Sequence, residues 1–169
     1  ARSRRIVCFG SSRVGPDHPS TQLAHEVGRI LGERGIVVLS GGYAGTMEAV
    51  SRGAAEVGGS AIGVTTRTFA SRTPNRYLAA EWIEPDYLSR LSTLCRQAHG
   101  FVALPGGLGT LSEWVTAWCL MTIGQAPAPL YVFENPWRPV FDAVLALEEV
   151  DPVHAEHVHW LAGPADLAR

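Results

Sequence analysis

The sequence predicts an α/β protein built on a doubly wound parallel sheet, with helices on both faces. Short, uninterrupted apolar segments alternate along the chain with longer segments whose apolar residues recur every three or four positions. Continuous apolar strands are typical of parallel sheets, because helices cover both of their faces. The chain has 169 residues, 46% of them apolar and 18% charged, which suits one domain with its own core. No linker-like stretch divides it, so we expect a single domain over residues 1–169.

Three strands and two helices are expected in the first part of the chain. The strands are expected at residues 6–9, 36–39 and 61–65. The first helix is expected to begin at a cap on Ser20 or Thr21 and to end at Gly35, because the apolar residues between them fall on one face. A second helix is expected from about Thr46 to Val57.

The alternation continues in the second part of the chain. Residues 66–80 have no clear period and contain Pro74, which predicts a functional or flexible loop. Strands are expected at residues 82–84, 101–104 and 130–133. Helices are expected after a cap on Asp86, after residue 107, and from 136 to about 149 after a cap on Asn135. The stretch after Asp151 is expected to pack on the edge of the sheet.

The helix expected after residue 107 carries two tryptophans. Trp114 and Trp118 are interpreted as core or interface residues rather than as a platform for a bound base. Together with Val115, Cys119 and Met121, they give this helix more apolar surface than one buried stripe needs. Such an excess predicts an interface between copies of the chain, and hence a homodimer or a multiple of dimers.

Charge and composition exclude several classes of function. The net charge is −2, with 16 acidic and 14 basic residues, which argues against nucleic acid as a partner. All 14 basic residues are arginines, and the chain contains no lysine. No Schiff base can form without a side-chain amine, so pyridoxal phosphate chemistry is excluded. A P-loop, which needs a lysine on the phosphates, is excluded too.

Cysteine usage and hydropathy bear on the compartment. Cys8, Cys95 and Cys119 are widely spaced in apolar stretches, which is typical of buried, inert thiols. The basic start of the chain is followed by an apolar run too short for a signal-peptide core. No apolar run approaches the roughly 20 residues of a membrane span. We therefore expect a soluble cytoplasmic protein without a membrane partner.

Three of the expected strands end in small residues that could bind a phosphate. These are Gly10, Ser11 and Ser12 after the first strand, Gly41, Gly42, Gly45 and Thr46 after the second, and Gly106, Gly107, Gly109 and Thr110 after residue 104. The last two runs share the order of strand, glycine pair, glycine, threonine and helix. Glycine permits close approach of the backbone, and a helix N-terminus presents free N–H groups. We expect these two loops to lie side by side as a phosphate cradle; alternatively, the glycines only close tight turns.

The first loop does not have the spacing of a dinucleotide site. After the first strand, Gly10 is followed by the next glycine only at Gly15, which is not GxGxxG. A mononucleotide or a sugar phosphate therefore fits this chain better than NAD.

The segment PGGLGTLSE at residues 105–113 resembles the PGGxGTxxE signature of the LOG ("LONELY GUY") family. Residues 41–49, Gly58-Gly59 and Arg90 are similar to that family as well, so the resemblance covers roughly residues 5–135. It implies a Rossmann-like fold, a homodimer or a larger assembly of dimers, and a phosphoribohydrolase. The glycine loops, the absence of lysine and the lack of a metal-ligand pattern predict that this hydrolase needs no metal or organic cofactor. That enzyme would release the free base from a cytokinin riboside 5′-monophosphate or from AMP. The name "lysine decarboxylase" that many members carry does not suit a lysine-free chain as a pyridoxal enzyme.

The resemblance also implies which residues are catalytic. By position, Arg90 and Glu113 match the arginine and glutamate of the family, and the glycines with Thr110 match its phosphate loop. The sequence departs from the family at Leu91, where many members have lysine, and in GGYAGTMEA at residues 41–49, where others have GGG and GLMG. Both departures bear on the choice of base.

The chemistry of this reaction suits those two residue types. Breaking a ribosyl C–N bond builds positive charge on the sugar, which a carboxylate stabilises while it orients water. Arginine does not lose its proton, so Arg90 is expected to hold the phosphate and to orient Glu113. Each of the two residues has a simpler alternative. Glu113 could form a capping box with Thr110 at the start of its helix, and Arg90 could be a surface residue whose charged end reaches solvent.

Other polar residues are weaker candidates. Ser12, Arg13, Asn75 and Arg76 are secondary candidates for ligand contact, and His154, His157 and His159 are interpreted as solvated rather than as metal ligands. The alternative function is a non-catalytic carrier of a nucleotide or of molybdenum cofactor. A role in DNA processing ranks third because of the net charge.

Overall fold

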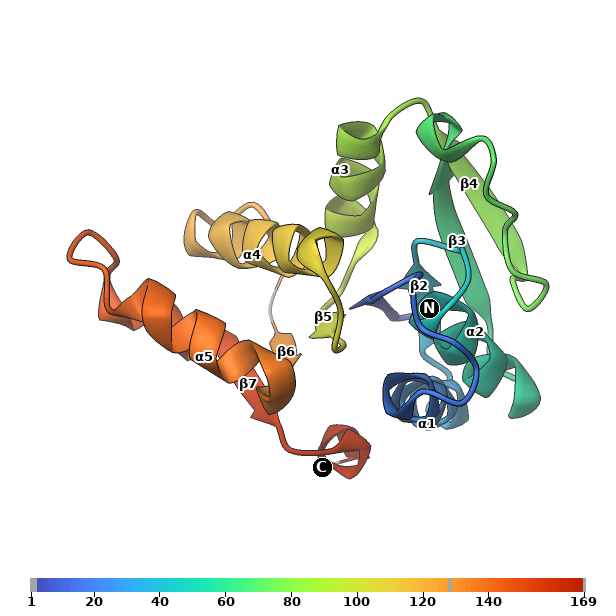
Figure 1. The fold of residues 1–169 in the computed structure, drawn as a ribbon, viewed down its shortest axis with the longest axis horizontal. Coiled ribbons are helices and arrows are strands. Elements are labelled where there is room, and N and C mark those ends of the chain that lie inside the picture. Colours follow the sequence, from blue (N-terminus) through green and yellow to red (C-terminus); the bar gives the residue numbers. More distant parts are fainter. Residues whose placement is uncertain (1–2, 128, 169) are drawn as a thin grey trace.

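The computed structural model describes residues 3–127 and 129–168, and these residues form one seven-stranded sheet (Figure 1). Its strands are β1 (Arg5–Phe9), β2 (Val37–Ser40), β3 (Ala61–Thr66), β4 (Ala80–Glu84), β5 (Phe101–Ala103), β6 (Leu130–Phe133) and β7 (Val158–Leu161). Their order is β4-β3-β2-β1-β5-β6-β7, and every neighbouring pair is parallel. The predicted parallel α/β fold is confirmed.

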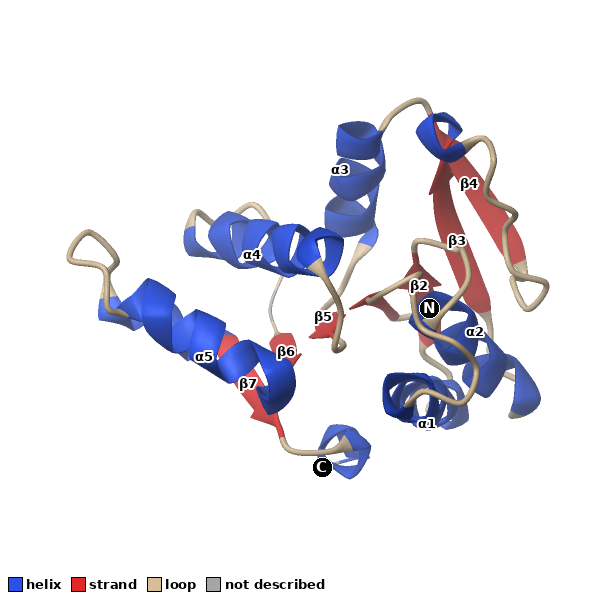
Figure 2. Ribbon diagram, in the orientation of Figure 1, coloured by secondary structure: helices blue, strands red, loops and turns tan. Residues whose placement is uncertain are grey.

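The helices cover both faces of this sheet (Figure 2). They are α1 (Pro19–Glu33), α2 (Thr46–Glu56), α3 (Tyr87–Gln97), α4 (Leu108–Thr122) and α5 (Glu134–Leu145), with short 3₁₀ helices η1 (Arg67–Phe69), η2 (Pro152–His157) and η3 (Pro164–Ala168). Strand β1 shows how the layers form: Val7 and Phe9 pack in the core with α3, α4 and α5, whereas Cys8 packs in the core with α1 and α2. Strand β1 therefore supplies two cores, which is why its residues 7–9 are all apolar.

The tryptophans of α4 lie in the core. Trp114 is fully buried and Trp118 is 5% exposed. Their rings stack with centroids 6.0 Å apart, and Trp118 also stacks on Phe141 of α5 at 5.0 Å. The interpretation of these side chains as core residues is confirmed. Because they are covered within the chain, they supply no surface for a second copy, and the homodimer stays a prediction.

Several boundaries differ from expectation. The cap of α1 is His18, whose Nδ1 accepts a hydrogen bond from the Ser20 amide at 3.1 Å, rather than Ser20 or Thr21. Helix α5 ends at Leu145, and Asn135 before Pro136 has non-helical angles, as a residue that precedes a proline usually does. The predicted loop contains η1, and β4 starts two residues earlier than expected, where it pairs with β3.

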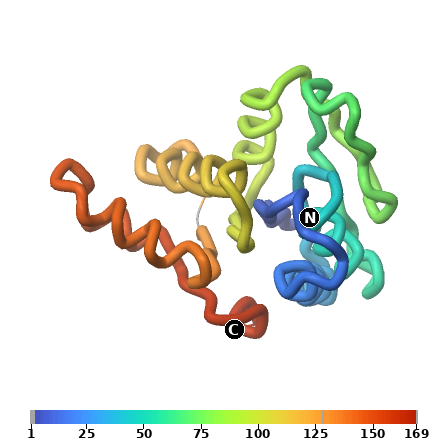
Figure 3. Tube along the Cα trace, in the orientation of Figure 1, coloured from blue at the N-terminus to red at the C-terminus, as the bar shows by residue number. Residues whose placement is uncertain are grey.

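The chain end packs on the sheet edge as predicted. Strand β7 extends the sheet beside β6, and η3 then lies next to α1 (Figure 3). Arg34, the residue at the end of α1, donates hydrogen bonds to the carbonyls of Leu167 and Ala168. Among the described residues, no helix is both long and apolar enough to cross a membrane.

The strand order decides where a ligand can bind. From β1 the chain moves outward to β2, β3 and β4 in one direction, and then returns to place β5 on the other side of β1. The loops that follow β1 and β5 therefore diverge to opposite faces of the sheet and leave a crevice between them. Parallel α/β sheets bind their ligands at such a point.

Candidate active site

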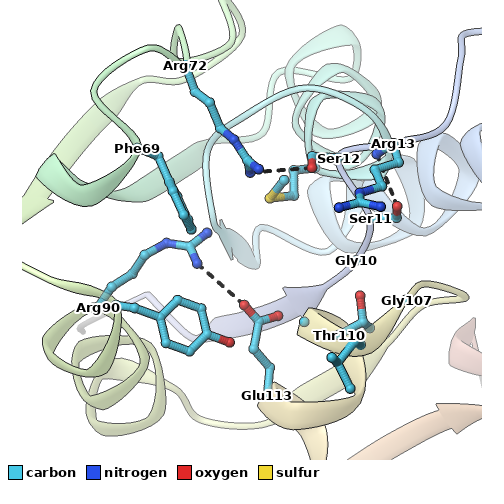
Figure 4. Close-up of a pocket in the computed structure, with 14 residues that line it drawn as sticks. Gly10, Ser11, Ser12, Arg13, Phe69, Arg72, Arg90, Gly107, Thr110 and Glu113 are labelled. Carbon is cyan, nitrogen blue, oxygen red and sulfur yellow. Dashed lines mark hydrogen bonds and ion pairs between the residues drawn. The ribbon is translucent and has the colours of Figure 1, made fainter.

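A cavity of about 400 Å³ lies at this crevice, beyond the carboxyl ends of β1 and β5 (Figure 4). The loop after β1 contributes residues 10–13, and the start of α4 contributes residues 107–110 together with Glu113. Arg90 and Tyr87 enter from α3. Met47 of α2 and two residues that follow β3, Phe69 and Arg72, complete the wall.

The N-terminus of α4 opens into the cavity. Gly107 is the N-cap residue and makes no side-chain capping bond, so α4 presents its first amides without a side-chain partner. At Gly107 and Gly109 there is open space where a Cβ would stand, and at Gly106 a Cβ would lie 2.1 Å from the Thr110 hydroxyl. Unpaired amides and the partial positive charge of a helix N-terminus suit a phosphate group.

The capping-box alternative for Glu113 is wrong. Helix α4 begins at Leu108, so Thr110 is its third residue and cannot be the cap. The side chain of Glu113 lies in the second turn and turns toward α3 instead (Figure 4). Helix capping therefore gives no reason for a glutamate at this position.

Glu113 and Arg90 form a buried ion pair in the cavity wall. Arg90 Nη1 lies 3.4 Å from Glu113 Oε1, and the two residues are 4% and 7% exposed. Arg90 Nε also donates a 2.6 Å hydrogen bond to the Val64 carbonyl. The prediction that these residues lie together is confirmed, whereas the surface interpretation of Arg90 is wrong because the side chain points into the molecule.

Burial changes the acidity of this carboxyl. It raises the pKa of Glu113 to about 7, because the loss of water around the charge outweighs the attraction of Arg90. Glu113 therefore exists in both protonation states near neutral pH. A carboxyl with such a pKa inside a cavity is typical of general acid–base sites.

The second glycine loop does not lie beside the α4 loop, and that expectation is wrong. Strand β1 separates β2 from β5, so the loop after β2 lies behind the loop after β1. Thr46 shows its role: its amide donates to the Ser11 carbonyl at 2.9 Å, and its hydroxyl accepts from the Ser11 amide at 2.9 Å. At Gly45, which has φ +70, a Cβ would lie 2.2 Å from the Ser11 carbonyl oxygen. Gly41, Gly42, Gly45, Thr46 and Gly106 do not line the cavity.

The secondary candidates divide into two groups. Ser12 and Arg13 line the cavity, as predicted for possible ligand contacts. Asn75 is buried and donates to the carbonyls of Gly42 and Tyr43, which makes it a structural residue of the loop. Arg76 pairs with Tyr77 at the surface.

Sequence reasoning missed part of the wall between β3 and α3. Arg72 stacks on Phe69, 4.3 Å from the ring centroid, and its Nη1 lies 3.4 Å from the Ser12 hydroxyl. Tyr87 donates to or accepts from the Ser112 hydroxyl at 2.8 Å. Residues 66–80 have no clear period and predict a functional or flexible loop, but their sequence does not indicate which side chains line the cavity.

The chain carries no converging set of metal ligands in its described part. Within residues 3–127 and 129–168, no three His, Cys, Asp or Glu side chains gather in a way that could hold an ion. The backbone carbonyl of His154 accepts a hydrogen bond from Trp118 Nε1 at 2.9 Å, and the His159 ring lies against Tyr131.

Fold and site together define a Rossmann-like α/β protein with a helix N-terminus and a buried carboxylate in the wall of one cavity. The family model described as "Possible lysine decarboxylase" matches residues 47–166. A probable cytokinin riboside 5′-monophosphate phosphoribohydrolase of Oryza sativa subsp. japonica is 35% identical over 96% of this chain and 67% of its own length. The cytokinin riboside 5′-monophosphate phosphoribohydrolase of Mycobacterium tuberculosis is 34% identical over 78% of this chain and 70% of its own length. The chain belongs to the LOG family.

This chain is shorter than those relatives. Another probable cytokinin riboside 5′-monophosphate phosphoribohydrolase of Oryza sativa subsp. japonica, 32% identical, is matched over 88% of this chain but only 63% of its own length. The chain thus spans about two thirds of the length of each of these curated relatives.

Solved structures share the fold. The molybdenum cofactor binding protein of the phototrophic bacterium Rippkaea orientalis superposes with a TM-score of 0.79 at 20% identity, covering 99% of this chain and 94% of that one. The molybdenum cofactor carrier protein of Chlamydomonas reinhardtii gives 0.77 at 22% identity, covering 98% and 94%. At these identities the likeness establishes the fold alone.

Proposed function

We propose that this protein hydrolyses the N-glycosidic bond of a purine nucleoside 5′-monophosphate, a cytokinin riboside monophosphate or AMP. Water supplies a hydroxyl to C1′ of the ribose and a proton to the departing base, so the products are the free base and ribose 5-phosphate. The proposal draws on the printed names of the relatives and on one observation above all. That observation is the buried carboxylate of Glu113 in the wall of a cavity that also contains a helix N-terminus.

The 5′-phosphate is assigned to the N-terminus of α4. Residues 107–110 at the start of this helix line the same cavity as Ser11, Ser12 and Arg13 of the loop after β1. Charge-assisted hydrogen bonds from an arginine and from backbone amides suit a phosphate dianion. Anchoring the phosphate there leaves the ribose beside Glu113, one turn further along the same helix.

Glu113 is assigned the central chemical role. In its ionised form it stabilises the positive charge that grows on the ribose as the C–N bond breaks, and it accepts a proton from the attacking water. The pKa of about 7 makes this carboxylate a stronger base than an ordinary glutamate while leaving a large ionised fraction near neutral pH.

Arg90 is assigned to the support of Glu113. Its guanidinium keeps its proton at every physiological pH, so it cannot deliver one to the base. Its positive charge holds the Glu113 carboxyl at 3.4 Å and lowers the pKa that burial has raised. Arg90 therefore favours the ionised form of this buried carboxyl and offsets part of the effect of burial.

Lysine decarboxylation is not part of this proposal. Pyridoxal enzymes hold their cofactor through a lysine imine, and this chain has no lysine. The description of the matching family model is therefore not adopted for the activity of this chain.

The decisive experiment incubates the protein with a panel of nucleoside 5′-monophosphates and measures released base by chromatography. Release from AMP or an N6-substituted analogue, with much slower release from the matching nucleosides, is expected because the nucleosides lack the phosphate anchor. Glu113→Gln serves as the matched inactive variant. Tight binding of a nucleotide without any release of base would instead favour the non-catalytic carrier. The assignment of the site to nucleotides would be contradicted if the protein showed no binding and no release.

A further inference from the structure

The guanidinium of Arg90 lies in a fitted recess that we call the Arg90 socket, formed by Gly41, Tyr43 and the carbonyl of Val64. The socket lies behind the cavity wall, on the ends of β2 and β3. None of its three residues lines the cavity itself. The socket therefore has no direct contact with a ligand in the cavity, and any effect that it has on the site passes through the position of Arg90.

Gly41 leaves the space that Arg90 occupies. A Cβ at this position would stand 1.7 Å from Arg90 Nη2 and 2.9 Å from Arg90 Cζ. It would also stand 2.6 Å from the sulfur of Met47. Gly41 is not among the glycines with positive φ, so the backbone would accept alanine and only these side chains would have to move.

Tyr43 closes the other side of the socket. Its ring centroid lies 5.7 Å from Arg90 Cζ, within the range of a cation–π contact. The Tyr43 hydroxyl donates to the Thr66 carbonyl at 3.2 Å and accepts from the Thr66 amide at 3.0 Å. Two backbone hydrogen bonds from β3 thus fix the ring, which is 3% exposed.

We propose that Gly41 and Tyr43 are positioning residues, which hold the Arg90 guanidinium against the Glu113 carboxyl. In this proposal the loop after β2 does not bind phosphate. It fixes the position of the Arg90 guanidinium instead. With Nε held by Val64, Nη2 against Gly41 and the ring of Tyr43 alongside, Nη1 is the nitrogen that reaches Glu113. The kinetic part of this inference rests on the proposed function, but its structural part does not.

Displacing Arg90 has a measurable consequence at Glu113. The guanidinium lowers the pKa of this carboxyl, so its withdrawal should raise that pKa above about 7. Activity that needs ionised Glu113 would then appear only at higher pH. Apart from Arg90, the titratable groups that line the cavity with this carboxyl or are electrostatically coupled to it are Cys95, Tyr87, Arg13 and Arg72. Gly41→Ala replaces none of these four residues, whereas Tyr43→Leu also removes a ring that lies 5.8 Å from Arg72 Cζ.

The test is Gly41→Ala, examined by carbon NMR titration of the Glu113 carboxyl and by pH–rate profiles with a nucleoside monophosphate. We expect the Glu113 midpoint to rise by about one pH unit or more. We expect kcat at pH 7 to fall roughly 10-fold to 100-fold, with partial recovery at higher pH and a smaller change in KM. Tyr43→Leu removes the ring and should move both quantities in the same direction.

Gly32→Ala is the control for general destabilisation. A Cβ at Gly32 would lie 2.7 Å from Val57 Cγ2 and 3.0 Å from the Ala54 carbonyl oxygen. This contact joins α1 to the end of α2, on the opposite face of the sheet from Arg90. We expect a lower melting temperature for this variant but the wild-type Glu113 midpoint.

The outcomes separate the socket from the proposed function. If the wild-type protein releases no base, the proposed function fails, yet the NMR midpoints of the variants still decide the role of the socket. If Gly41→Ala does not fold, Tyr43→Leu decides alone. The inference would be overturned if the folded Gly41→Ala and Tyr43→Leu variants had the same Glu113 titration midpoint and the same pH–rate profile as the wild-type protein.

Discussion

Replacing Glu113 by glutamine should abolish most turnover without destabilising the protein at alkaline pH. Glutamine has nearly the same shape and still offers an oxygen to Arg90, but it carries no charge for the transition state. We expect kcat to fall by roughly 10²-fold or more, the scale seen when one electrostatic partner of a transition state is removed. Release of base from a nucleoside monophosphate under saturating conditions measures this loss.

The stability effect follows from the pKa of Glu113. Its pKa rises from an ordinary 4.5 to about 7 on folding, so the folded state binds this proton more tightly than the unfolded state does. The carboxyl therefore stabilises the fold most below pH 4.5, and that contribution is lost as the pH rises through about 7. At about 1.4 kcal/mol per pH unit, the loss is about 3 kcal/mol by pH 8.

The Glu113→Gln variant does not lose stability in this way as the pH rises, because glutamine does not ionise. From pH 4.5 to pH 8, the free energy of unfolding of Glu113→Gln should gain about 3 kcal/mol relative to wild type. For a chain of this size each kcal/mol corresponds to roughly 2–4 °C in Tm, so the variant should melt no lower than wild type at pH 8. Thermal unfolding at both pH values measures the difference.

Glu134→Gln is the matched control for Glu113→Gln. Glu134 is exposed on α5 and lies 4.0 Å from Arg138, so both turnover and pH dependence should stay as in wild type. A Glu113→Gln variant that keeps turnover within threefold of wild type would refute the catalytic assignment. Parallel pH–stability curves for wild type and variant would refute the reasoning from burial.

Three further predictions concern the same molecule. Arg13→Ala should raise KM for a nucleoside monophosphate about 10-fold with little change in kcat, and steady-state kinetics with the phosphate-free nucleoside as control would show no such rise. The pH–rate profile of the wild-type protein should rise with pH through about 7, as Glu113 ionises; activity that is flat from pH 5 to pH 9 would contradict this. Light scattering at micromolar concentration should give a homodimer or a multiple of dimers of the 18.2 kDa chain, and a monomer would contradict the expected assembly.

Local patterns in the sequence determined most of the elements. Short apolar runs such as Phe101–Ala103, which are bounded by turn residues, predict strands covered on both sides. Asp86 accepts the hydrogen bond of the Ser89 amide, as a helix cap should. The turn before α4 follows from Pro105, Gly106 and Gly107 in the same way. Such features depend on neighbours within a few positions, which a sequence displays directly.

Only the tertiary structure decided how the site is assembled. The two glycine loops look equivalent in the sequence, but strand order places β1 between β2 and β5, so one loop faces the cavity and the other supports it. Arg90 and Glu113 are 23 positions apart on different helices, and their contact depends on how α3 and α4 pack over the sheet. The pKa of Glu113 depends on that packing as well, because burial is a property of the folded chain and not of the residue.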